Sequence, residues 1–288
     1  MIPYTLERLG LRRMDDEKYI RLVYLFWNGV EPDLDHPQIY MEKLNWIKLH
    51  DRREIYTTMV DKYRVKEYVA SIIGEEHVIP LIRDSHGGVY NSFDEIDFSE
   101  LPEQFVLKTN HDSGGVAICR DKKEFDIPKV RADLTARLQR NFADDGREWP
   151  YQNVKRCIIA EEYIEDLADS NYKFFCFDGK VKALYVAPFR EKTVDYFDAD
   201  YNHLDIYTRL HQCAPVPPER PASFEQMKEM AERISEGYPH MRVDFYDVHG
   251  KIYFGEITFF LEGGFVPFMP EKWNKIFGDW LVLPAAVS

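Results

Sequence analysis

The chain has 288 residues, and its 37 Lys and Arg against 50 Asp and Glu give a net charge of −13 at pH 7. Apolar residues make up 45% and aromatic residues 15% of the sequence, which excludes a disordered chain and predicts a substantial core in one large domain or two to three small ones. So acidic a protein lacks the basic surface that nonspecific nucleic-acid or anionic-membrane binding needs. A small anionic ligand is not excluded, because local cations can still converge on it.

Neither a membrane span nor a secretory signal is expected. No apolar run approaches the roughly 20 residues that cross a bilayer, and residues 1–16 contain no apolar signal core. None of the four cysteines forms a C-x-x-C pair. We therefore expect free, buried thiols in a reducing cytoplasm rather than a disulfide or a zinc site. The cysteines are Cys119, Cys157, Cys176 and Cys213.

In chain order, the first 75 residues have helical apolar spacing, with a clear stripe from Val65 to Ile73 that Gly74 ends. Further helices are predicted to begin near Asp126 and at Ser223, where Gln226 would complete a capping box. Short apolar runs between them predict strands. These runs are Val78–Ile82, Phe105–Thr109, Val116–Cys119, Arg156–Ala160, Tyr172–Phe177, Val181–Ala187, Met241–Asp247 and Lys251–Thr258. Strands joined by tight turns, with inserted helices, indicate an α+β protein built mostly on antiparallel sheet.

The last two strands are predicted to form a hairpin around residues 249–251. A three-residue loop with glycine in the left-handed region is a common hairpin connection. That loop would pair Val248 with Ile252 and would place Asp244 directly opposite Glu256.

Because side chains alternate along a strand, Arg242, Asp244, Glu256 and Thr258 would project from one face of this hairpin. Two carboxylates that face each other repel unless a positive charge lies between them. A hard divalent cation such as Mg²⁺ would remove the repulsion. Pairing of Asp244 or Glu256 with a nearby Lys or Arg on a solvated face is the alternative.

A lysine and a glycine-rich loop follow each other in the middle of the chain. Lys108 ends an apolar strand, where an ammonium group needs a partner. Ser113, Gly114 and Gly115 then form a loop whose backbone N–H groups could approach phosphate oxygens. Taken alone, this segment is better explained as an ordinary surface turn.

A second strand exit could contact a nucleotide base. The apolar strand that begins at Arg156 runs into acidic residues, and Glu161 at its end could accept a hydrogen bond from a purine amine. A strand that leaves the core for a solvated loop is the simpler interpretation of this segment by itself.

Together, the order and spacing of these segments resemble the ATP-grasp superfamily, whose members hold ATP between two α+β subdomains. The resemblance implies a first phosphate-binding lysine in Asp61-Lys62 and a second at Lys108, before a lid loop that runs from His111 to Gly115. It also implies a hinge that contacts the base and an acidic contact to the ribose, for which Asp169 is expected. The hinge residues would be Glu161, Glu162, Tyr163 and Ile164.

The same resemblance implies a metal motif, R-x-D followed by E-x-N. Here the motif is Arg242-Val-Asp244 and Glu256-Ile-Thr258, so that threonine replaces the usual asparagine. Mg²⁺ would lie on Asp244 and Glu256, with Thr258 as a weaker ligand. Arg242 and Lys108 are the expected catalytic residues, and Lys173 or Arg190 would assist the lysines in neutralising phosphate charge.

A closer resemblance, over residues 35 to 284, is to the TupA-like ATP-grasp family of teichuronopeptide and bacterial capsular polysaccharide biosynthesis. The segments that carry it include Lys43-Leu-Asn-Trp46, Phe93-Asp-Glu-Ile-Asp97, Gly146-Arg-Glu-Trp149, Tyr172-Lys-Phe-Phe-Cys-Phe177 and Arg242-Val-Asp-Phe-Tyr246. It implies ATP-dependent ligation of an amine, such as an amino acid, to the carboxylate of a uronic acid or glycan precursor.

The domain organisation implied is an N-terminal helical region over residues 1–75, a lid subdomain over 76–160 and a metal-binding C-terminal subdomain over 161–288. Two other functions stay open at this point: an ATP-grasp-fold kinase, and a non-catalytic nucleotide-binding component of a glycan assembly complex. The sequence does not indicate an oligomeric state or the identity of the substrates.

Overall fold

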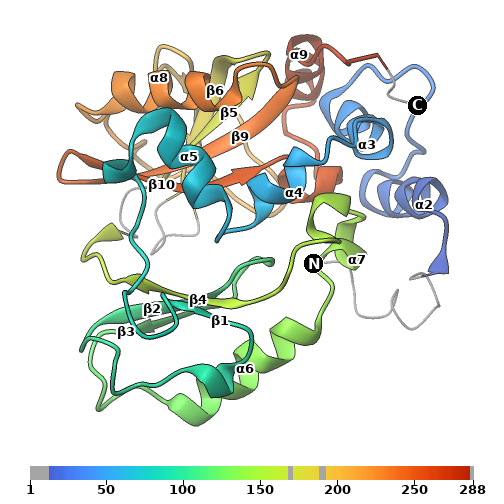
Figure 1. Cartoon of the computed structure of the whole chain (residues 1–288). Coiled ribbons are helices and arrows are strands. Elements are labelled where there is room, and N and C mark those ends of the chain that lie inside the picture. The colour runs from blue at the N-terminus through green and yellow to red at the C-terminus, as the bar shows by residue number, and fades with distance from the viewer. Residues whose placement is uncertain (1–12, 168–170, 188–192, 286–288) are drawn as a thin grey trace. The chain divides into compact units, whose positions relative to one another are not determined.

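The computed structural model describes residues 13–167, 171–187 and 193–285. The chain divides into two compact units (Figure 1). The first unit comprises the described parts of residues 1–53, 144–148 and 166–288, and the second comprises residues 54–143 and 149–165. The three-part division implied by the sequence resemblance stays a prediction.

The first unit is built on an antiparallel sheet of order β10-β9-β5-β6-β7-β8. Every neighbouring pair of strands in it is antiparallel, so the sheet needs only hairpins and returning loops. Its strands are β5 (Asn171–Phe177), β6 (Lys180–Val186), β7 (Asp195–Asp198), β8 (His203–Leu204), β9 (His240–Val248) and β10 (Lys251–Thr258).

Helices cover both faces of this sheet. Residues of β5 point alternately to its two sides, so successive residues pack against different helices. Phe174 packs against Phe224 of α8 (Phe224–Ser235), with ring centroids 5.9 Å apart. Phe175 faces the other way and meets Phe277 of α9 (Lys272–Trp280) at 5.3 Å. Tyr40, the first residue of α3 (Tyr40–His50), packs on the same side as Phe277. Helix α2 (Asp16–Asn28) also belongs to this unit, and Gly29 ends it with φ 74°.

The second unit contains an antiparallel sheet of order β1-β4-β2-β3. Its strands are β1 (Val89–Tyr90), β2 (Phe105–Thr109), β3 (Val116–Cys119) and β4 (Ile158–Glu162). Its main helices are α4 (Ile55–Val60), α5 (Val65–Ile73) and α6 (Ile127–Gln139). Asp126 caps α6 by accepting the backbone N–H of Lys129, as its sequence predicts, and buried Leu134 joins α6 to the core beneath the sheet.

Short helical turns complete the described chain. They are α7 (Ala143–Gly146) and the 3₁₀ turns Glu75–His77, Phe93–Glu95, Trp149–Tyr151 and Leu261–Gly264. In the described residues, no helix combines the length and the apolar composition that spanning a bilayer requires. The mixture of helices and antiparallel sheets confirms the α+β class.

Two local expectations are wrong. Residues 78–82 form no strand, and Leu81 makes only an isolated bridge to Glu161. Ser223 precedes α8 as expected but makes no capping box, because its hydroxyl donates a hydrogen bond to Asp247 instead. The short strands β1, β7 and β8 have no counterpart among the predicted runs.

Candidate active site

The hairpin of β9 and β10 turns more tightly than its sequence predicts. Lys251 pairs with Val248, so only His249 and Gly250 form the loop. Both loop residues have positive φ, 53° and 87°, as a two-residue turn of type I′ requires. The expected three-residue loop, with Val248 opposite Ile252, is therefore wrong.

A β-bulge between Phe254 and Ile257 then changes the register. The bulge adds one residue to β10, so that Gly255 and Glu256 together stand opposite Asp244 of β9. Asp244 and Glu256 are thus neighbours across the hairpin, as expected, but the bulge rather than the loop length brings them together.

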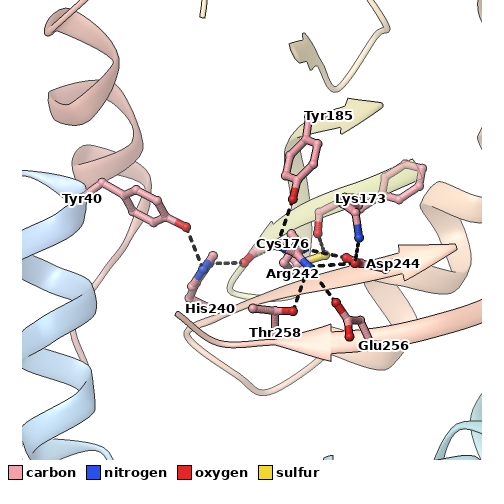
Figure 2. Close-up of polar contacts among 10 residues, drawn as sticks. Tyr40, Lys173, Cys176, Tyr185, His240, Arg242, Asp244, Glu256 and Thr258 are labelled. Carbon is pink, nitrogen blue, oxygen red and sulfur yellow. Dashed lines mark hydrogen bonds and ion pairs between the residues drawn. The ribbon is translucent and has the colours of Figure 1, made fainter. Parts of the chain in front are cut away.

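The guanidinium of Arg242 joins the polar residues of this face (Figure 2). It donates two parallel hydrogen bonds to the Asp244 carboxylate, Nε to Oδ1 at 2.7 Å and Nη2 to Oδ2 at 2.8 Å. It also donates to Glu256 Oε1 at 3.2 Å and to Thr258 Oγ1 at 2.9 Å. Nη1 donates to the Tyr185 hydroxyl at 3.0 Å. We call these five residues the Arg242 cluster.

A second cation reaches the same carboxylate. Lys173 of β5 pairs with Asp244 in the sheet register, and its ammonium forms an ion pair with Asp244 Oδ2. The side chain of Asp244 is 1% exposed and that of Glu256 is 41% exposed. The sequence left two alternatives open for these carboxylates: a divalent cation, or pairing with Lys or Arg on a solvated face. The structure shows Asp244 paired with Arg242 and Lys173, in a buried rather than a solvated position.

Burial alone would lower the pKa of the Arg242 guanidinium, but Asp244 outweighs this effect and holds that pKa well above its usual range.

A neutral histidine, His240, lies on the same strand. Burial lowers the pKa of His240 to about 3. Since the Cys176 carbonyl can only accept, His240 Nδ1 donates to it at 2.9 Å, and the Tyr40 hydroxyl donates to Nε2 at 3.0 Å.

The donor atoms of the Arg242 cluster fit a hard divalent cation. Asp244, Glu256 and Thr258 offer carboxylate and hydroxyl oxygens, which are the ligand types that Mg²⁺ takes. The exposed side of Glu256 leaves room for ligand exchange, whereas both oxygens of Asp244 already accept hydrogen bonds from cationic groups. Metal binding at Asp244 therefore competes with Arg242 and Lys173.

The second unit contains another buried charge cluster. Glu161 of β4 forms ion pairs with Lys108 of β2, at 2.5 Å, and with Lys66 of α5, at 2.6 Å. Burial alone would raise the pKa of the Glu161 carboxyl, but the ammonium groups of Lys108 and Lys66 outweigh it and lower the pKa to about 2. Glu161 is thus the partner that the ammonium group of Lys108 needs on an apolar strand.

The glycine-rich loop between β2 and β3 is held by its own polar groups. Lys62 donates to the carbonyl of Asp112, whose carboxylate accepts from Thr109 and, at 2.9 Å, from Arg137. A Cβ on Gly115 would lie 1.8 Å from Thr109 Oγ1, so only glycine fits there. Lys62 thus contacts the loop itself, and Lys108 lies on the strand that leads into it.

At the tip of that loop, Ser113 and Gly114 are exposed. Gly114 has φ 83°, a conformation that glycine adopts readily. His111, at the start of the loop, is fully buried, although a loop histidine is more often exposed. Its Nε2 lies 3.2 Å from the Arg140 carbonyl, and burial lowers its pKa.

The structure describes some of the remaining predicted nucleotide contacts and leaves others outside the described residues. Glu162 is exposed, Tyr163 and Ile164 are half-buried, and the Tyr163 hydroxyl accepts a hydrogen bond from Arg120. Asp169 and Arg190 lie outside the described residues. The structure does not test the roles assigned to any of these residues.

Sequence reasoning missed Lys66 and Tyr185. Lys66 lies on the helix that the apolar stripe from Val65 to Ile73 predicts, but no motif in the sequence marks it as a partner of Glu161. Tyr185 carried no signal either, because its place depends on the pairing of β5 with β6, which sets Tyr185 opposite Lys173.

Comparison with known proteins decides the family. The family model for TupA-like ATP-grasp proteins matches residues 42–282, which is most of the chain. The chain belongs to the TupA-like ATP-grasp family. This membership, with the two α+β units described above, confirms both the resemblance and the ATP-grasp fold expected from the sequence. No curated protein matches the sequence significantly.

Solved structures similar to this TupA-like ATP-grasp protein include D-alanine–D-alanine ligases. The enzyme from Bacillus anthracis is 18% identical with a TM-score of 0.43, over 78% of this chain and 66% of that one. The Helicobacter pylori enzyme is 18% identical with a TM-score of 0.46, over 78% and 61%. The ATP-grasp ligase PsnB, solved with a precursor peptide and AMPPNP, is 10% identical with a TM-score of 0.41, over 83% and 64%. The chain spans less than two thirds of the length of each of these proteins.

Proposed function

We propose that this protein is an ATP- and Mg²⁺-dependent carboxylate–amine ligase, which forms an amide through an acyl-phosphate. Its substrates would be an amine, such as an amino acid, and the carboxylate of a uronic acid or peptide side chain of a cell-surface polysaccharide. The observation that carries the proposal is the Arg242 cluster, where two carboxylates and a hydroxyl gather around one buried arginine. Membership of the TupA-like ATP-grasp family supports the reaction class.

In this proposal, Asp244, Glu256 and Thr258 would hold Mg²⁺, which supplies charge neutralisation for the triphosphate when it is bound. The ammonium groups of Lys62, Lys108 and Lys173 stabilise the phosphate oxygens. Transfer of the γ-phosphoryl group to the acceptor carboxylate gives an acyl-phosphate and ADP. Attack by the amine then forms the amide and releases phosphate.

Arg242 has a distinct task in the second step. The tetrahedral intermediate carries an oxyanion, and a preorganised guanidinium stabilises such a charge without reorganising. Asp244 and Tyr185 fix the orientation of Arg242 before any substrate arrives. The exposed tip of the glycine-rich loop, Ser113 and Gly114, would close over the phosphates and protect the acyl-phosphate from water.

A phosphate-release screen tests the proposal. The purified protein is incubated with Mg²⁺, ATP, a panel of uronic acids and a panel of amino acids, and the Glu256→Gln variant measures background hydrolysis. A ligase releases phosphate only when a carboxylate and an amine are both present. A stable phosphorylated product without an amine would indicate a kinase, and ATP binding without turnover across the panels would indicate a non-catalytic component.

A further inference from the structure

A mixed group of metal-ligating side chains lies at the other edge of the first unit's sheet, away in the strand order from the β9–β10 hairpin. One ligand atom of Asp195, one of His203 and the Sγ of Cys213 all lie within 4.8 Å of one another. Neither the nucleotide nor the proposed ligation chemistry uses these three residues. They come from separate segments of the chain, so no short spacing motif in the sequence reveals them.

Strand pairing places the first two residues together. Phe197 of β7 pairs with His203 of β8, so their side chains share one face of the sheet. Asp195 lies two residues before Phe197 and projects from the same face, diagonally across from His203. The result is a contact of 3.0 Å between His203 Nε2 and Asp195 Oδ1.

The segment that carries Cys213 is tied to the same strand. Gln212 forms a parallel bridge with Thr193, and its carbonyl accepts the backbone N–H of Val194 at 2.9 Å. On the other side of Cys213, the backbone N–H of Ala214 donates to Asp195 Oδ2 at 3.1 Å. Cys213 is therefore held between the backbone hydrogen bond at Gln212 and the hydrogen bond from Ala214 to Asp195, which keep it beside that carboxylate.

The second observation that points to a metal at this cluster is the buried charge of Asp195. Its side chain is fully buried, and buried carboxylates are normally paired with a cation or coordinated to a metal. Among the residues that the structure describes, no lysine or arginine forms an ion pair with Asp195, and the contact with His203 counts as one only if that ring is protonated.

We propose that Asp195, His203 and Cys213 form a zinc site, separate from the magnesium site of the proposed ligase. One sulfur, one imidazole nitrogen and one carboxylate oxygen form a ligand set that suits Zn²⁺ and not Mg²⁺. Binding exchanges the Cys213 thiol proton, which now faces the Ile206 carbonyl, for the metal and releases that proton to solvent. Water fills the fourth position.

The geometry is close to what zinc requires. Nitrogen and oxygen ligands about 2.0 to 2.1 Å from a tetrahedral zinc ion lie about 3.3 Å apart, near the 3.0 Å that separates His203 from Asp195. The sulfur lies within 4.8 Å of both atoms, and bond lengths of about 2.3 Å to sulfur and about 2.0 Å to nitrogen or oxygen would bring it to about 3.5 Å from them. The His203 side chain is 36% exposed, so an ion can enter from solvent. The bound ion would cross-link β7, β8 and the loop that returns to them.

The test is a titration of the metal-free full-length protein with Co²⁺, in excess Mg²⁺ so that oxygen-only sites are filled. We expect one Co²⁺ per chain with a thiolate-to-cobalt charge-transfer absorption, and displacement of the cobalt by Zn²⁺. The Cys213→Ser variant should lose this absorption, and His203→Asn should bind zinc at least roughly tenfold more weakly. His249→Asn, which changes an exposed histidine of the same unit, is the matched control.

A second measurement needs no variant. Alkylation of cysteines followed by peptide mass spectrometry reports the reactivity of each thiol, and Zn²⁺ should protect Cys213 while the three buried cysteines stay unreactive with or without zinc. Cobalt binding without a charge-transfer absorption, or alkylation of Cys213 at the same rate with and without zinc, would overturn the proposal. Neither result depends on ATP turnover, so the ligase proposal stands or falls separately.

Discussion

The guanidinium of Arg242 and the carboxylate of Asp244, two residues apart on the same face of β9, form two parallel hydrogen bonds of 2.7 and 2.8 Å. Paired in this way, a buried carboxylate stays ionised and an arginine keeps a fixed orientation. The pair therefore has two roles in the proposed ligase: it stabilises the fold of the first unit, and it prepares the site for substrate. These two roles can be separated by experiment.

We predict that Asp244→Asn and Glu256→Gln both abolish ATP turnover but differ in their effect on stability. Asp244 is buried between two cations, and breaking such a pair costs about 3 kcal/mol or more. Glu256 is 41% exposed, so its substitution should change the free energy of unfolding by less than about 0.5 kcal/mol. Urea denaturation measures both effects. An unaltered unfolding free energy for Asp244→Asn would contradict the burial described here.

Lys108→Met should weaken ATP binding about tenfold, because the proposed phosphate contact is lost. Lys66→Met is the matched variant, since both lysines share the carboxylate of Glu161. Calorimetry with a non-hydrolysable ATP analogue compares the two affinities. We expect Lys66→Met to lower stability with a smaller loss of affinity. If ATP bound to both variants as tightly as to the wild-type protein, Lys108 would have no place in the site.

The Glu161 carboxyl should make the free energy of unfolding depend on pH in the acidic range. Its pKa falls from an ordinary value of 4.5 to about 2 on folding, so the stabilisation is complete above pH 4.5 and is lost as the pH falls towards 2. The shift corresponds to roughly 3 kcal/mol. In urea denaturation, Glu161→Gln should be less stable than the wild-type protein at pH 6, and this difference should shrink towards pH 3. Glu162→Gln, at the exposed neighbouring position, should show no such pH dependence.

Local patterns in the sequence were sufficient for most of the architecture. The strand from Phe105 to Thr109 and the helix capped by Asp126 follow from apolar spacing and side-chain chemistry within a few residues. The bulge at Gly255 was not predictable in this way, because the register of β10 depends on its packing against β9. Ser223 failed as a capping-box residue for a similar reason: Asp247, far along the chain, captures its hydroxyl.

For the site, sequence reasoning found the acidic pair but not its partners. The resemblance to the ATP-grasp motif assigned Arg242 and Asp244 to the chemistry, whereas their direct pairing and the ion pair with Lys173 required the register between β5 and β9. The cluster at Cys213 shows the same limit. No C-x-x-C spacing marks it, because antiparallel pairing and a parallel bridge, not sequence neighbours, assemble it.

The most direct test of the ligase proposal is the dependence of ATP affinity on Mg²⁺, measured by calorimetry with a non-hydrolysable analogue. The wild-type protein and the surface control Glu271→Gln should bind the analogue at least roughly tenfold more tightly with Mg²⁺ than without it. Glu256→Gln should lose most of that enhancement while it unfolds at the wild-type urea concentration. An enhancement of the same size in Glu256→Gln would contradict the assignment of the metal to this hairpin.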